Sequence, residues 1–128
     1  MAIRVLIVDD HSVVREGLRM FLERDPELEV VGEAADGAEA VRLAQQLQPD
    51  IVLMDLLMPG MDGIAATAAL RRVVPKSVVV ILSISDDPQT REQAHAAGAI
   101  AFVEKHGSTD TLFAAIRQAA GQTNESSE

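Results

Sequence analysis

The chain alternates between two patterns of apolar and polar positions. Short runs of apolar, often β-branched residues are typical of buried strands, whereas apolar residues three or four positions apart mark one face of a helix. The run Ile3–Val8 is the first predicted strand. The segment after it is the first predicted helix, whose apolar face is made by Val14, Leu18, Phe21 and Leu22. Four more such pairs follow, so the sequence predicts five strands and five helices.

Turn and cap residues set the boundaries of these elements. Asp25-Pro26 ends the first helix and Gln48-Pro49 the second, because the residue before a proline disfavours helical geometry. The predicted strands are Ile3–Val8, Glu29–Glu33, Ile51–Asp55, Val78–Leu82 and Ile100–Val103. The later helices are predicted from Asp36-Gly37, over Ile64–Val73, over Gln89–Ala97 with Gly98 after it, and with an inner face of Leu112, Ala115, Ile116 and Ala119.

Strict alternation of strands and helices with short loops predicts a parallel sheet that is covered by helices on both faces. We expect an α/β fold with a doubly wound, five-stranded parallel sheet in the flavodoxin-like order 2-1-3-4-5. In this order the first and third strands are neighbours, and ligands bind beyond the carboxyl ends of the strands. Candidate chemistry is therefore expected at that edge of the sheet.

Composition and charge narrow the function classes. The chain of 128 residues is long enough for one domain, predicted over residues 1–120, and Gly121–Glu128 has no apolar residue and is predicted to be a linker or frayed tail. The absence of cysteine excludes disulfides and thiolate metal sites and fits the cytoplasm. A net charge of −9 opposes direct binding of nucleic acid, and no apolar run is long enough to cross a membrane.

Polar residues stand at the ends of four predicted strands. The run Ile51–Asp55 is apolar on both faces, which suits a strand in the middle of a sheet, and it delivers Asp55 to the carboxyl edge. Asp9-Asp10 follow the first strand, Ser83 the fourth and Lys105 the fifth. Taken singly, each has an ordinary interpretation, such as a solvated strand end or a surface lysine. Taken together, they predict one site.

Carboxylates gathered at one edge require a balancing charge, since two of them about 4 Å apart repel by about 4 kcal/mol at an effective dielectric constant of roughly 20. Lys105 supplies one positive charge, and oxygen ligands without cysteine or paired histidine favour Mg²⁺ over Zn²⁺. Asp55 can then act as a nucleophile toward a phosphoryl group, and Ser83 can donate a hydrogen bond to a phosphoryl oxygen. The histidines show no ligand spacing and are predicted to be non-catalytic: His11, His95 and His106.

On these motifs the chain resembles the receiver domain of two-component response regulators, most closely the NarL/FixJ (LuxR-type) subfamily. The resemblance covers Ile3–Ala120. The stretches that carry it are Ile3–Gly17 (IRVLIVDDHSVVREG), Val30–Gly37 (VVGEAADG), Pro49–Gly63 (PDIVLMDLLMPGMDG) and Ala97–Lys105 (AGAIAFVEK). It implies the (βα)5 receiver fold and a phosphoacceptor switch rather than an enzyme that acts on other molecules.

The resemblance also implies a role for each site residue. Asp55 would be the phosphoacceptor and Lys105 would pair with the phosphoryl group. Ser83 would be the switch hydroxyl and Phe102 the switch aromatic. The ligands of Mg²⁺, or of Mn²⁺ in its place, would be Asp10, Asp55, the backbone carbonyl of Leu57 and Asp9, the last directly or through water.

Partners follow from the same resemblance. The phosphodonor would be a histidine kinase, and an output domain, often a DNA-binding domain that regulates transcription, would follow the receiver. Phosphorylation would promote a homodimer. Two dimer surfaces stay open, one made by the fourth helix, fifth strand and fifth helix, and the other by the first and fifth helices. No membrane contact is expected.

Two positions depart from the family pattern. The residue after the switch hydroxyl is usually small, whereas this chain has Ile84, which we expect to crowd access to the phosphorylation site. The residue after the lysine is often a proline with a cis bond, whereas this chain has His106. A cis bond before a residue other than proline costs roughly 3–4 kcal/mol, so the geometry of the Lys105–His106 bond is left open.

Two other protein classes share parts of the pattern. A phosphatase of the haloacid-dehalogenase type also uses a strand-end aspartate and Mg²⁺, but it needs a second aspartate two residues on, where this chain has Leu57. A flavodoxin-like cofactor binder needs a polar or glycine-rich phosphate loop after the first strand. This chain has Asp9-Asp10 there, and these carboxylates repel a phosphate unless a metal ion is present.

Overall fold

The computed structural model describes residues 2–56, 62–84, 87–105 and 109–126. Strands and helices alternate along the chain, as the sequence pattern predicts. Their order is β1 (Ile3–Val8), α1 (Ser12–Leu22), β2 (Leu28–Ala34), α2 (Gly37–Leu47), β3 (Ile51–Asp55), α3 (Gly63–Val73), β4 (Val78–Ser83), α4 (Pro88–Ala97), β5 (Ala101–Glu104) and α5 (Thr109–Ser126).

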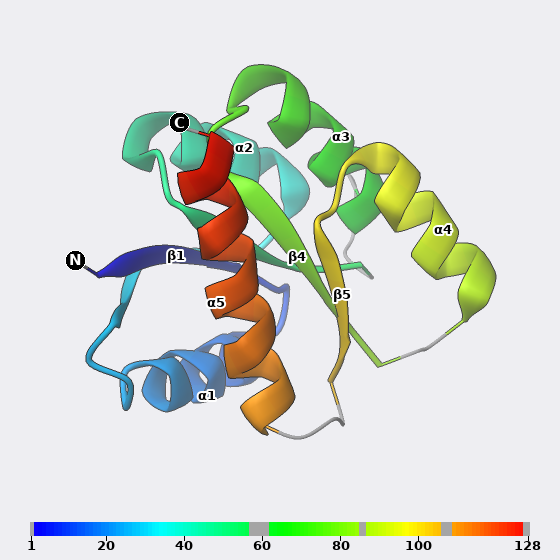
Figure 1. The fold of residues 1–128 in the computed structure, drawn as a ribbon. Coiled ribbons are helices and arrows are strands. Elements are labelled where there is room, and N and C mark those ends of the chain that lie inside the picture. The colour runs from blue at the N-terminus through cyan, green and yellow to red at the C-terminus, as the bar shows by residue number, and fades with distance from the viewer. Residues whose placement is uncertain (1, 57–61, 85–86, 106–108, 127–128) are drawn as a thin grey trace.

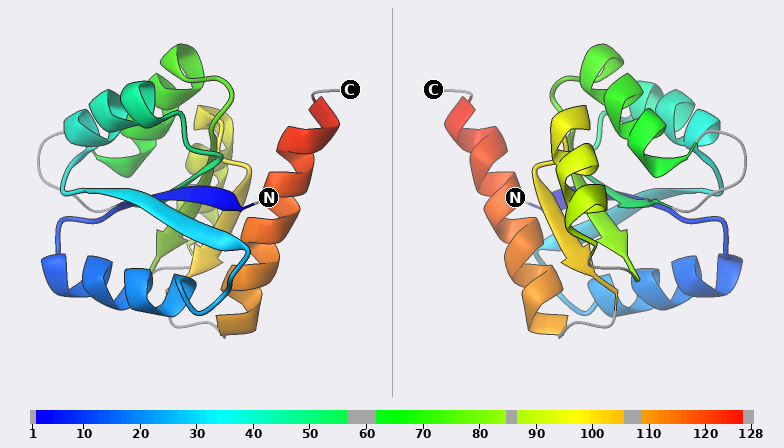
Figure 2. Two further views of the ribbon diagram at one scale, coloured as in Figure 1. Left: turned by 90° about the vertical axis from the view of Figure 1, so that its left-hand side faces the viewer. Right: turned by 90° about the vertical axis from the view of Figure 1, so that its right-hand side faces the viewer.

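The strands form a parallel sheet in the order β2-β1-β3-β4-β5, so the predicted fold class and strand order are confirmed. Helices α1 and α5 cover one face of the sheet, and α2, α3 and α4 cover the other (Figures 1 and 2). Because β1 and β3 are neighbours, the residues that follow these two strands emerge side by side at the carboxyl edge.

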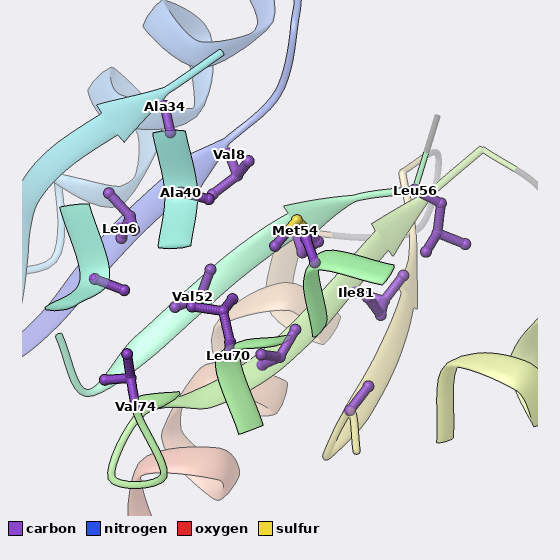
Figure 3. Packing of buried hydrophobic residues seen from close by; sticks show 14 of the residues in the cluster. Leu6, Val8, Ala34, Ala40, Val52, Met54, Leu56, Leu70, Val74 and Ile81 are labelled. Atoms are coloured by element: carbon purple, nitrogen blue, oxygen red, sulfur yellow. The ribbon is translucent and has the colours of Figure 1, made fainter. Parts of the chain in front are cut away.

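An apolar core lies on each face of the sheet, and β3 contributes to both, since alternate side chains of a strand point in opposite directions. Val52 and Met54 pack toward α2 and α3 (Figure 3). Ile51 and Leu53 pack into the core that α1 and α5 cover. Every residue of β3 is buried. A fully buried side chain of this size contributes about 1.5–3 kcal/mol, so the strand that ends at Asp55 is firmly held.

Aspartate side chains cap three of the helices in the described part of the chain. Asp36 accepts a hydrogen bond from the Glu39 amide, and Asp62 accepts one from the Ala65 amide, each at 2.8 Å. Asp87 caps α4, which begins at Pro88, one residue before the predicted start. Proline suits the first helical position because its fixed φ angle matches the helix. None of the helices described is long and apolar enough to span a membrane.

Some boundaries differ from the prediction. Strand β5 begins at Ala101 rather than at Ile100, whose side chain stays 41% exposed. The last helix continues to Ser126, into the segment predicted to be a linker or tail. That segment holds no proline, and backbone hydrogen bonds can carry a helix beyond the last residue that packs against the sheet. The domain boundary at residue 120 stays a prediction.

Gly98 ends α4 in a conformation that side chains disfavour. Its φ angle is +114°, and its amide donates to the carbonyl oxygens of the last turn of α4. A Cβ atom at this position would lie 2.4 Å from Cγ of Arg71, which crosses over it from α3. Glycine therefore allows both the left-handed backbone and the close contact between α3 and the end of α4.

Replacing Gly98 by alanine is expected to lower the free energy of unfolding by about 1–2 kcal/mol, because the left-handed backbone is strained for an L-residue. Urea unfolding followed by circular dichroism measures the change, since the chain has neither tryptophan nor tyrosine. Gly17→Ala is the matched control. Gly17 lies inside α1 with no atom within 4 Å of a new Cβ, so alanine should stabilise by about 0.5–1 kcal/mol. Equal effects of the two substitutions would contradict this account of Gly98.

Candidate functional site

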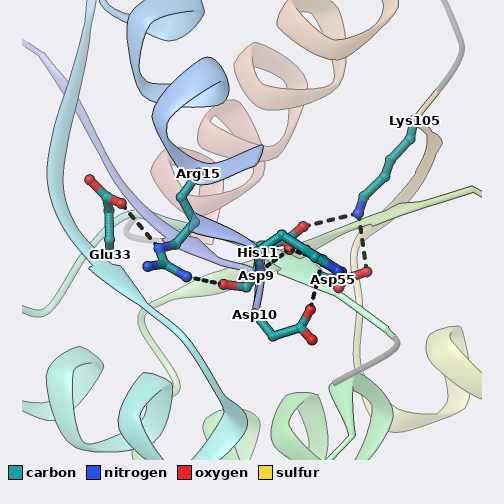
Figure 4. A network of polar contacts seen from close by, with 7 residues as sticks. All are labelled: Asp9, Asp10, His11, Arg15, Glu33, Asp55 and Lys105. Carbon is teal, nitrogen blue, oxygen red and sulfur yellow. Dashed lines mark hydrogen bonds and ion pairs between the residues drawn. The ribbon is translucent and has the colours of Figure 1, made fainter. Parts of the chain in front are cut away.

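Four strands deliver polar side chains to the carboxyl edge of the sheet. Asp9 follows β1, Asp55 ends β3, Ser83 ends β4 and Lys105 follows β5. The Lys105 ammonium lies 2.9 Å from Oδ2 of Asp9 and 3.4 Å from Oδ1 of Asp55 (Figure 4). Lys105 thus contacts both Asp9 and Asp55, although the three residues lie at the ends of three different strands of the sheet.

The Lys105 ammonium is held in its charged form. Burial by itself lowers the pKa of this group, but the hydrogen bond to Asp9 and the charges of Asp55 and Asp9 outweigh burial and leave the pKa above its ordinary value. Lys105 therefore carries a full positive charge at neutral pH. This single positive charge offsets part of the repulsion between two carboxylates that are themselves almost entirely buried, Asp9 at 1% and Asp55 at 7% exposure.

Asp9 is fixed by contacts on all sides. Its amide donates to the carbonyl oxygen of Ala34 on β2 at 3.1 Å. Its Oδ1 accepts a hydrogen bond from the His11 amide at 2.9 Å, and its Oδ2 accepts one from Lys105. Every polar group of this side chain is therefore paired within the protein.

Asp10 is less well satisfied. Its Oδ1 is buried and has no hydrogen-bond partner among the described residues, although Nδ1 of His11 lies 3.1 Å away. Asp9, Asp10 and His11 each offer a ligand atom, and these atoms lie within 4.8 Å of one another. A buried carboxylate oxygen without a donor, beside a second carboxylate, fits a hard divalent cation such as Mg²⁺.

The other predicted site residues lie at different distances from this cluster. Ser83 is buried at the end of β4, and its carbonyl oxygen accepts a hydrogen bond from the Lys105 amide at 2.6 Å. Phe102 lies on β5, farther from the carboxyl edge, and it lines the cavity between β5 and α4. The Arg91 guanidinium lies 5.0 Å from the centroid of its ring. Ile84 is 55% exposed. Leu57 and His106 lie outside the described residues.

Some contacts at this edge were not predicted from the sequence. The ring of His11, which was predicted to be non-catalytic, contacts Asp9 and Asp10. No role was predicted for Arg15, whose guanidinium donates hydrogen bonds to the Asp9 carbonyl oxygen and to Glu33 (Figure 4). One signal was available in the sequence: Arg15 lies in the first turns of the helix that directly follows Asp9-Asp10.

Gly63, at the start of α3, is a further contributor that spacing did not reveal. Its amide donates to the carbonyl oxygen of Leu56 at 3.0 Å. A Cβ atom here would lie 2.3 Å from the backbone oxygen of Asp55 and 2.7 Å from Cα of Leu56. Backbone atoms cannot yield as a flexible side chain can, so only glycine lets α3 begin this close to the end of β3.

Comparison with known proteins agrees with this geometry. The family model of the response regulator receiver domain matches residues 5–117. The transcriptional regulatory protein LiaR of Bacillus subtilis (strain 168) is 46% identical over 119 residues, which are 92% of this chain and 56% of that protein. The response regulator protein VraR of Staphylococcus aureus (strain NCTC 8325 / PS 47) is 39% identical over 118 residues, with the same coverage of 92% and 56%. The chain thus spans about half the length of these relatives.

Solved structures give the same result. The crystal structure of a two-component response regulator of the LuxR family from Aurantimonas sp. SI85-9A1 superposes with a TM-score of 0.91 at 38% identity, covering 95% of this chain and 87% of that one. Receiver domains are phosphoacceptor switches rather than enzymes, and their phosphodonors are histidine kinases. The match over nearly the whole chain, in sequence and in structure, shows that this chain belongs to the family of response regulator receiver domains of two-component signalling.

Proposed function

We propose that this receiver accepts a phosphoryl group on Asp55 from a histidine kinase and changes conformation in response. The observation that carries the proposal is the bridge from the Lys105 ammonium to the carboxylates of Asp9 and Asp55. The bridge places a permanent positive charge beside the carboxylate that ends the central strand. Such a charge can neutralise an oxygen of an incoming phosphoryl group.

The transfer forms one bond and breaks another. A carboxylate oxygen of Asp55 attacks phosphorus, and the bond from phosphorus to the nitrogen of the donor histidine breaks as the imidazole leaves. Lys105 keeps its proton throughout. It stays hydrogen-bonded to Asp9 and donates a further hydrogen bond to an oxygen of the phosphoryl group. Ser83 is buried at the end of the neighbouring strand β4, and we propose that it donates its hydroxyl hydrogen to another phosphoryl oxygen.

The residues at this edge suit a bound Mg²⁺ ion. We propose Asp10 and Asp55 as direct ligands, with Asp9 binding directly or through water and the Leu57 carbonyl, outside the described residues, as a further ligand. Bound there, the cation would supply further positive charge and lower the repulsion between the carboxylates and the phosphoryl group. The buried Oδ1 of Asp10, which accepts no hydrogen bond from the described residues, is the observation that supports its part in this set.

The output of the switch is proposed from the relatives. LiaR and VraR are named as regulators and are almost twice as long as the matched segment. We propose that phosphorylation of this receiver promotes a homodimer and controls a DNA-binding output domain in a full-length cytoplasmic regulator. Ser83 and Phe102 are proposed to link the site to the face made by α4, β5 and α5, where Phe102 meets Arg91.

Asp55→Asn is expected to abolish uptake of a phosphoryl group from acetyl phosphate with Mg²⁺ present, because the amide is not a nucleophile at this position. Intact-mass spectrometry counts the phosphoryl groups, and the unmodified chain should gain one. Asp36→Asn is the control, since asparagine also caps a helix and Asp36 lies at the start of α2. A full mass shift in Asp55→Asn would disprove the assignment, and continuous release of inorganic phosphate with turnover would favour the phosphatase class.

Phosphorylation should shift the protein from monomer to dimer. The phosphoryl group adds about −1.5 to −2 charges, which we expect to draw Ser83 toward the site and let Phe102 turn inward. Sedimentation velocity with and without a beryllofluoride mimic measures the change. Charge reversal at Arg91 on α4, compared with charge reversal at Arg19 on α1, tells which of the two candidate surfaces is used. Equal sedimentation in both states refutes the link between site and surface.

Ile84→Ala is expected to shorten the lifetime of phospho-Asp55 by about tenfold, a change of about 1.4 kcal/mol in the barrier. Hydrolysis needs a water in line with the Asp55–phosphorus bond, and the stiff, β-branched Ile84 should crowd its approach. The exposure of Ile84, 55%, supports a side chain that lies at the mouth of the site rather than packed into α4.

Loss of the phosphoryl mass over time, with Mg²⁺ present, gives both decay rates. Ile100→Ala is the matched control. Ile100 is also exposed, at 41%, but it precedes β5 and so lies at the amino-terminal ends of the strands, away from the site. Equal decay in Ile84→Ala and the unmodified chain, or slower decay in the variant, would overturn the crowding argument.

A further inference from the structure

Arg15 lies in the first turns of helix α1, and its side chain reaches back to the turn that carries the two acidic residues. Its Nη1 donates a hydrogen bond to the backbone carbonyl oxygen of Asp9 at 2.5 Å. Its Nε donates to Oε1 of Glu33 on β2 at 3.1 Å (Figure 4). The Arg15 side chain is 17% exposed and that of Glu33 is 28% exposed, so the pair is partly shielded from water.

The carbonyl that Arg15 holds is part of the peptide unit that joins Asp9 to Asp10. This unit is planar, so fixing its oxygen also fixes the direction in which the Asp10 backbone leaves. On the other side of Asp9, the amide is fixed to Ala34 of β2. The turn is therefore clamped at both ends, and the guanidinium provides the clamp nearer to Asp10.

From this geometry, we propose that Arg15, held in place by Glu33, is a positioning residue that sets the direction of the Asp10 carboxylate for a bound divalent cation. The inference rests on the proposed function, since it concerns the same Mg²⁺ site. A guanidinium suits the task because its planar fork can donate in two fixed directions at once, one to the carbonyl and one to Glu33. A lysine ammonium at the same place would retain the charge but not both directed contacts.

A purely electrostatic role for Arg15 makes the opposite prediction. A positive charge near the site repels a divalent cation, so removing the charge should strengthen Mg²⁺ binding. A positioning role predicts weaker binding, since the Asp10 carboxylate loses its fixed direction. The sign of the change in affinity therefore separates the two roles.

The decisive measurement is the dissociation constant of Mg²⁺ alone for the unphosphorylated protein, by isothermal titration calorimetry. The variants are Arg15→Gln, Arg15→Lys and Glu33→Gln. Arg19→Gln is the matched control, because Nε of Arg19 lies 3.3 Å from the other oxygen of the same Glu33 carboxylate but one helical turn beyond Arg15. Thermal unfolding of every variant in EDTA reports stability without metal, separately from affinity.

We expect Arg15→Gln and Arg15→Lys to raise the dissociation constant about ten- to a hundredfold, the range usual for groups that orient metal ligands. Glu33→Gln should raise it less, because the Asp9 carbonyl contact remains. Arg19→Gln should leave it unchanged or lower it slightly. The loss of Mg²⁺ affinity should be larger than any loss of stability that the unfolding midpoints in EDTA show. A loss of affinity that only parallels a fall in these midpoints would overturn the inference.

Unchanged or tighter Mg²⁺ binding in both Arg15 variants would also overturn it. Should Arg15→Gln fail to fold, Arg15→Lys and Glu33→Gln decide the matter, because both keep a hydrogen-bonding group at each position. Phosphorylation of the unmodified chain by acetyl phosphate distinguishes a failure of the Arg15 inference from a failure of the proposed function. If Asp55 is phosphorylated and Mg²⁺ binds normally to both Arg15 variants, the inference alone fails. If the unmodified chain neither binds Mg²⁺ nor gains a phosphoryl group, the proposed function fails with it.

Discussion

The balance of charge between one ammonium group and the buried carboxylates of Asp9 and Asp55 is the constraint on which the rest of this structure depends. Both carboxylates are almost fully removed from water, and unpaired charges in such positions cost several kcal/mol each. Lys105 offsets part of that cost, yet it follows the edge strand β5, while Asp55 ends the central strand β3. Its side chain therefore links the end of the edge strand to the end of the central strand.

The sheet order makes this balance possible. Parallel strands bring their carboxyl ends to one edge, and the neighbouring positions of β1 and β3 set Asp9 beside Asp55. The apolar residues of β3 face two separate cores, so the strand is anchored from both sides. The strands thus hold these side chains at one edge, with Asp55 at the end of its strand and Asp9 and Lys105 one residue beyond theirs. The acidic turn after β1 is held in addition by Arg15 and Glu33.

Sequence patterns were informative wherever a rule of geometry relates neighbours in the chain to neighbours in space. The strand order and the gathering of Asp9, Asp55 and Lys105 follow from alternating elements in a parallel sheet. Contacts that depend on the reach of a single side chain could not be predicted from these patterns. Arg15 meets Glu33 across 18 positions of sequence, and no periodicity predicts such a pair. The late start of β5 and the extension of α5 reflect the same limit, because the ends of elements depend on local packing. The roles of Ser83, Phe102, Ile84 and Leu57 stay predictions.

The backbone contact at Gly63 couples two properties that are usually adjusted separately. The start of α3 rests against the peptide of Asp55, so the packing of a helix and the orientation of the candidate phosphoacceptor share the same few atoms. A sequence that drifts over evolutionary time can exchange core residues of α3 and regain stability elsewhere. It has no such freedom at Gly63, since any larger residue must displace either the start of α3 or the backbone of Asp55 and Leu56. Selection for a stable fold and selection for a correctly placed Asp55 therefore both favour glycine at this position.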